Sequence, residues 1–98
     1  MFSWGVIMRI DFMPVRIRKE RLSYVREKAG RGHIVPQDII EVLCDVNREV
    51  YRNKKKARSD YLVKGQTFSG KCLTVCVKLL PEASFYGSDF ITAWESGS

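Results

Sequence analysis

Cationic and phenolic side chains with the capacity for chemistry gather between positions 51 and 61. The tyrosines Tyr51 and Tyr61 flank a polar segment with four cations that bear on this argument: Arg52, Lys54, Lys55 and Arg58. Lysine and arginine neutralise phosphate charge, and a tyrosine hydroxyl can donate or accept a hydrogen bond. The run of lysines from position 54 is also typical of a solvated hairpin tip, and Tyr61 also suits a packing residue with a wet hydroxyl.

His33 is the only histidine, and it follows the glycine corner Gly30-Arg31-Gly32. Three roles fit it: a capping or loop residue, a base or RNA contact, and a metal ligand. The three cysteines of the chain form neither a C-x-x-C pair nor a Cys/His zinc spacing. We therefore expect no metal site and no cofactor, and the odd number of cysteines predicts free thiols in a reducing compartment.

The stretch from Val15 to Ala29 has the period of an amphipathic helix. Val15, Leu22, Val25 and Ala29 form an apolar stripe, and Gly30 follows as a helix stop. The remaining surface carries six cations against two carboxylates, and the whole chain has a net charge of +6. A helix needs a solvated face in any case, but this excess predicts a nucleic acid or an acidic protein as partner.

Two further regions predict the elements that position these groups. A strand over 6–12 precedes Met13-Pro14, with Pro14 near a helix start, and a second helix runs from Pro36 to near Asn47. Its buried stripe is expected to be Ile39, Val42, Leu43 and Val46.

Strand patterns dominate the second half of the chain. A short strand over 49–53, an exposed loop over 54–60 and three strands over 61–67, 71–80 and 90–95 are expected, with a turn at Ser69-Gly70. In the middle strand the apolar residues from Leu73 to Leu79 alternate with small polar ones, which predicts one packed face and one half-wet face. The order predicts an α+β fold: an N-terminal strand, two helices, then a four-stranded antiparallel run with both helices on one face.

The 98 residues fit a single domain spanning 1–98, with a tail at 96–98 that is expected to fray. Residues 1–7 are either native or an N-terminal extension, because Met8 also suits a start. The chain has no apolar run of membrane-spanning length, and its N-terminus lacks a basic n-region and a clear cleavage site, so a cytoplasmic protein is expected.

Three segments carry a family resemblance that covers the chain from about Met8 to Glu95. They are the basic corner Lys28-Ala29-Gly30-Arg31-Gly32-His33, the helical segment Pro36-Gln37-Asp38-Ile39-Ile40-Glu41-Val42-Leu43, and the final strand Ile91-Thr92-Ala93-Trp94-Glu95. Together with the layout they resemble the small bacterial toxins of the RelE/ParE superfamily, nearest the BrnT-type branch. The chain differs from the family pattern at His33, which is shifted by one place, and at Trp94, where arginine is commonest.

The resemblance implies an RelE-like fold and the toxin of a toxin–antitoxin pair. Such toxins resemble metal-independent endoribonucleases that cleave mRNA at the ribosome and arrest growth, and an antitoxin with an acidic surface or segment neutralises them. Carried over, it implies catalytic roles for His33, Arg52, Arg58 and Tyr61. It implies that RNA phosphate is held by a further basic set: Arg18, Lys19, Arg26, Lys54 and Lys55. The alternative is a non-enzymatic module of the same fold that inhibits a target by contact. Trp94 suits base stacking as well as sheet packing or antitoxin contact.

Overall fold

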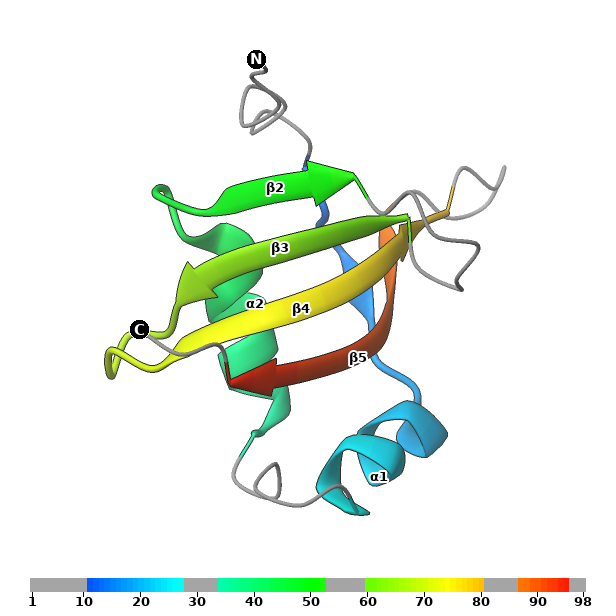
Figure 1. Ribbon diagram of the computed structural model, residues 1–98. Helices are drawn as coiled ribbons and strands as arrows, with labels where there is room; N and C mark the ends of the chain where they lie inside the picture. Colours follow the sequence, from blue (N-terminus) through cyan, green and yellow to red (C-terminus); the bar gives the residue numbers. More distant parts are fainter. Residues whose placement is uncertain (1–10, 28–33, 53–59, 81–86, 96–98) are drawn as a thin grey trace.

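A five-stranded sheet in the order β1-β5-β4-β3-β2 runs through the centre of the protein (Figure 1). The computed structural model describes residues 11–27, 34–52, 60–80 and 87–95. The helices and strands follow one another as β1 (Val15–Arg16), α1 (Lys19–Glu27), α2 (Pro36–Cys44), β2 (Glu49–Arg52), β3 (Tyr61–Gln66), β4 (Cys72–Leu79) and β5 (Ser88–Glu95). Strands β2 to β5 pair antiparallel, whereas β1 runs parallel to β5. The α+β class is confirmed. In detail the sheet is mixed rather than antiparallel throughout, because β1 pairs parallel with β5.

Helix α2 packs against one face of this sheet and lies behind it in Figure 1. A row of small apolar side chains crosses that face in register and is fully buried: Val50, Val63, Val75 and Ala93. The helix contributes Ile39, Val42 and Leu43 to the same core, and α1 contributes Val25. Burial of each such side chain stabilises the fold by about 1.5–3 kcal/mol, so apolar packing fixes which face α2 covers.

Carboxylates on α2 hold the β3–β4 turn. They lie at Asp38, Glu41 and Asp45, three to four residues apart, so one side of the helix and its C-terminal end present all three. Each bonds a different group of the hairpin: Lys71 Nζ to Asp38 (3.0 Å), Phe68 N to Glu41 (2.8 Å) and Gln66 N to Asp45 (2.9 Å). Gly65 permits this approach, because a Cβ there would stand 3.1 Å from the Val42 carbonyl oxygen.

The N-terminal part of the fold corrects two expectations. Residues 6–10 lie outside the described residues, and Asp11 and Phe12 are not in a strand. The extended segment instead follows Pro14, because β5 binds it: Ser88 Oγ donates to the Phe12 carbonyl (2.8 Å) and Ser88 N to the Pro14 carbonyl (3.0 Å). The first helix therefore begins at Lys19 rather than near Pro14.

Val15 is consequently a strand residue, not part of the helical apolar stripe. Ala29, the other end of that stripe, lies outside the described residues. Gly87 lies beside this strand with a φ of +150°, and a Cβ there would meet the Pro14 carbonyl oxygen at 2.0 Å. The close approach of β1 to β5 therefore requires glycine at this position.

The second helix ends earlier than its apolar pattern predicts. It stops at Cys44, and Val46 is 85% exposed in the turn that follows, so the expectation that Val46 belongs to the buried stripe is wrong. The reason is Asp45, whose carboxylate accepts hydrogen bonds from Asn47 N (2.9 Å) and Gln66 N (2.9 Å). Those bonds require extended backbone at Asp45 and turn the chain away from the helix axis.

We predict that Asp45→Asn lowers the free energy of unfolding by about 1–2 kcal/mol, because an amide accepts through one oxygen only and leaves a backbone N–H without its acceptor. Urea denaturation measures the effect. Glu27→Gln, which removes the same charge from an exposed position of α1, is the matched control and should change stability by less than about 0.5 kcal/mol. Equal losses in the two variants would contradict this account of α2 docking.

Candidate nucleic-acid interface

The face of the sheet opposite α2 is the candidate site, and it is called the open face below. No described helix lies over it in Figure 1. Strand alternation and register place two complete cross-strand rows on it: Glu49-Lys64-Thr74-Trp94 and Tyr51-Leu62-Cys76-Thr92. A third pair, Lys78 and Asp89, lies at the end of the face where β5 begins.

The first row combines a cation with an aromatic ring. Lys64 is exposed and Trp94 is half-buried, and each is paired directly with Thr74 on the strand between them. Proteins bind single-stranded nucleic acids through two such groups. A flat aromatic ring stacks on a base, and an ammonium group neutralises a phosphate. Thr74 and Cys76 are only 5% and 4% exposed, so the expectation of a half-wet face is wrong at the centre of β4.

Tyr51 of the second row and Glu49 of the first bring a phenol and a carboxylate together on β2. Tyr51 is exposed, and its hydroxyl donates a hydrogen bond to Glu49 two residues earlier on the same face. That hydrogen bond, with burial and the negative charge of Glu49 adding to it, raises the pKa of Tyr51 above its ordinary value of 10.0. Tyr51 is therefore protonated at neutral pH and can act as a hydrogen-bond donor or an acid, but not as a base.

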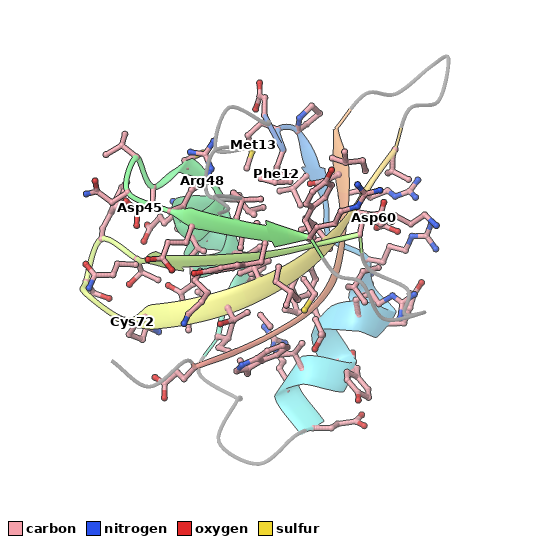
Figure 2. The ribbon with its side chains drawn as sticks, turned by 45° about the horizontal axis from the view of Figure 1, so that its top comes forward. Phe12, Met13, Asp45, Arg48, Asp60 and Cys72 are labelled. Carbon is pink, nitrogen blue, oxygen red and sulfur yellow. The ribbon has the colours of Figure 1, made fainter. Side chains whose placement is uncertain are left out.

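Three cations surround one buried carboxylate at the end of the open face, and they are called the Asp89 cluster. Arg16 Nε lies 3.4 Å and Arg18 Nε lies 3.8 Å from Asp89 Oδ1, and Lys78 is the cross-strand partner of Asp89. Figure 2 shows nitrogen-tipped side chains near Asp60, at the opposite end of the sheet from Asp45 and Cys72. The cluster thus extends the open face towards the start of α1.

Two residues expected to be catalytic lie on the face that α2 covers. Tyr61 packs beside the core, with its ring 6.1 Å from that of Phe12 in an edge-to-face arrangement, and Arg52 is its cross-strand partner. Tyr61 is half-buried and Arg52 is exposed at the end of β2. The register places Tyr51 on the face opposite Arg52. Of the two interpretations of Tyr61, these contacts favour packing.

Three of the expected RNA-binding residues lie in or just before α1. Arg18 belongs to the Asp89 cluster, Lys19 is the first residue of α1, and Arg26 is exposed in the last turn of that helix. The other four predicted site residues lie outside the described residues: His33, Lys54, Lys55 and Arg58. Among the predicted site residues that the structure describes, Arg18 is the one that lies at the open face.

Sequence reasoning missed the contributions of Glu49, Lys64, Lys78 and Asp89 to this face. The alternation of Glu49, Tyr51, Lys64 and Lys78 within their strands was a usable signal, but it needed the cross-strand register to become a surface. Asp89 gave no local signal, because Arg16 lies 73 positions away in the chain. Polar residues on alternate positions of three neighbouring strands are the pattern that would have found the site.

The described residues contain no group of three or more His, Cys, Asp or Glu side chains that could hold a metal ion. Within the same residues, no helix has the length and apolarity needed to cross a membrane.

We predict that Glu49→Gln lowers the pKa of Tyr51 towards 10.0, because the charged acceptor that favours the neutral phenol is removed. The raised pKa of Tyr51 stabilises the fold below pH 10, and that contribution is lost as the pH rises through the pKa of Tyr51 in the folded state. The ¹³Cζ signal of Tyr51 followed against pH measures the shift. An unchanged titration in Glu49→Gln, or an equal change in the charge-matched Glu27→Gln, would contradict the assignment.

Comparison with family models, with curated proteins and with solved structures yields no match for this chain.

Proposed function

We propose that this protein is the toxin of a toxin–antitoxin pair, and that it binds single-stranded RNA on the open face and cleaves it as a metal-independent endoribonuclease. Ribosome-bound mRNA in the cytoplasm is the proposed substrate, in line with the resemblance to RelE/ParE toxins. The observation that carries the proposal is the cross-strand row in which exposed Lys64 and half-buried Trp94 lie on the sheet face over which no described helix lies, beside the Tyr51–Glu49 pair.

The proposed binding follows from what each side chain offers. The Trp94 ring supplies a stacking surface, and stacking of one base on an aromatic side chain contributes about 1–3 kcal/mol. Lys64 supplies charge for a phosphate, and Tyr51, on β2 beyond Lys64, supplies a hydroxyl at the edge of the same face. Cations and π-faces bind nucleic acid with little sequence preference, so the surface suits a toxin whose selectivity comes from the ribosome.

The proposed cleavage assigns the Tyr51–Glu49 pair to proton transfer. RNA cleavage by its own 2′-hydroxyl needs a base for that hydroxyl, an acid for the departing 5′-oxygen and positive charge near the phosphorus. Glu49 is a carboxylate on the open face and can accept the proton, and protonated Tyr51 can donate one. Lys64, the cross-strand partner of Glu49, places the charge.

A second function has its own supporting observation. Arg52 and Tyr61, which match the chemistry of the family, lie on the face that α2 covers and away from the Lys64–Trp94 row. A chain in which these groups serve packing would be a contact inhibitor of the same fold rather than a nuclease. In either case, the antitoxin is proposed to cover the basic surface with an acidic segment.

We predict that induced expression arrests bacterial growth with new mRNA 5′ ends, and that Tyr51→Phe with Glu49→Gln abolishes both while leaving the thermal unfolding temperature within a few degrees. The double variant removes the proposed acid and base but keeps the ring and the shape of both side chains. Growth curves and primer extension from the same cultures provide the readout, with Arg52→Ala tested alongside.

Each outcome decides between the functions. Arrest and cleavage lost in the Tyr51/Glu49 variant support the open face as the catalytic site. Loss only in Arg52→Ala would move the site to the end of β2. Arrest by the wild type without RNA cleavage would favour the contact inhibitor, and no arrest from abundant, folded protein would refute the toxin proposal.

A further inference from the structure

We propose that the Asp89 cluster is a phosphate-binding site in which a buried carboxylate positions two arginines for one phosphate of the RNA backbone. This inference deepens the proposed function, because it names where the strand is anchored beyond the Lys64–Trp94 row. The site is formed by the segment before α1 together with the ends of β4 and β5. It consists of Arg16, Arg18 and Lys78 around Asp89.

The cluster has a buried side, formed by the carboxylate, and an exposed side, formed by the arginines. The side chain of Asp89 is only 9% exposed, whereas those of Arg16 and Arg18 are 36% and 44% exposed. Both arginines approach the same oxygen, Asp89 Oδ1, through Nε, which is the guanidinium nitrogen nearest the backbone. The carboxylate therefore lies beneath the two guanidinium groups, and the surface that the cluster presents is cationic.

Among the described residues, positive charges outnumber negative ones in and around the cluster. Two arginines converge on one carboxylate, and Lys78 on the neighbouring strand adds a third positive charge. Asp60, whose Oδ2 accepts the backbone N–H of Leu79 at 3.1 Å, adds a second negative charge nearby, so three cations face two carboxylates. Like charges held close together repel one another, and an anion bound above them would relieve that repulsion.

The chemistry of the cluster matches phosphate better than other anions. A guanidinium group offers several N–H donors in a planar fork that fits two phosphate oxygens at once, and such bonds are about twice as strong as neutral ones. Asp89 restricts the freedom of both side chains before the ligand arrives, which lowers the entropy lost on binding. Asp89 is thus a positioning residue, and the arginines are the groups that touch phosphate.

The location suits a nucleic acid strand that already lies on the open face. Trp94 and Asp89 are on the same strand, five residues apart, which corresponds to roughly 16 Å at about 3.3 Å per residue. A single strand that stacks a base on Trp94 and runs along β5 would reach the cluster with a backbone phosphate. Arg16 and Arg18 would then hold the strand where β5 begins.

Asp89→Asn separates a built site from general electrostatics, because the two accounts predict opposite signs. The substitution raises the net charge by one, so simple attraction predicts tighter binding of an anion. The site predicts weaker binding, by at least about threefold, since the arginines lose the charge that positions them. Glu20→Gln is the matched control: it adds the same charge at an exposed position in the first turn of α1 without altering the cluster.

The experiment measures binding of inorganic pyrophosphate by calorimetry, and of a fluorescein-labelled single-stranded RNA 12-mer by anisotropy, to the full chain and its variants at low salt. Expected are weaker binding of both probes by Asp89→Asn, undiminished binding by Glu20→Gln, and weaker binding by Arg18→Lys, which keeps the charge but loses the fork. If Asp89→Asn lowers the unfolding temperature, Arg18→Lys is the decisive variant, because the side chain of Arg18 is exposed.

The outcomes also separate this inference from the proposed function. Wild-type protein that does not bind pyrophosphate, or an Asp89→Asn variant that folds and binds it as tightly as Glu20→Gln does, would overturn the phosphate site. Pyrophosphate binding with the expected ranking of variants, in a chain that neither binds RNA nor arrests growth, would support the site and refute the RNA function.

Discussion

The docking of α2 onto one face of the sheet is the constraint on which the other features depend. Ile39, Val42 and Leu43 bury an apolar stripe against β3 and β4, while carboxylates of the helix and its cap bond the turn between those strands. Helix and hairpin are thereby fixed in register as well as in distance. Because α2 packs against one face, polar groups on alternate strand positions are presented on the other, where the proposed binding surface lies.

The same arrangement sorts the charges of a basic protein. Carboxylates take part in structure: Asp38 and Asp45 bind the hairpin, and Asp89 lies beneath two arginines. Cations are left towards solvent, with Lys64 on the open face and Lys78 at its end. Among the described residues, these lysines place positive charge on the open face and at its end, and such charge attracts a polyanion.

The sequence predicted the parts of this fold whose signals are local. Strand alternation identified β2 to β5, and Pro36 with its apolar stripe identified α2. The spacing around Val15 fits a helical stripe and so predicts a helix, whereas the two-residue strand that forms there depends on hydrogen bonds from Ser88, 73 positions away. The candidate site was found only in part for the same reason. Its chemistry could be read as residue types, but the separation of Tyr51 from Tyr61 onto opposite faces depends on register.

Fluorescence of Trp94 tests most directly whether the open face binds RNA. The chain has one other tryptophan, so Trp4→Phe leaves Trp94 as the only reporter. Titration with the same RNA 12-mer without its fluorescein label should quench and shift the emission of Trp94, because a base stacks on the indole. The change should saturate at the RNA concentrations at which anisotropy reports binding. RNA binding with no change in the emission of Trp94 would contradict the account and place the RNA elsewhere on the protein.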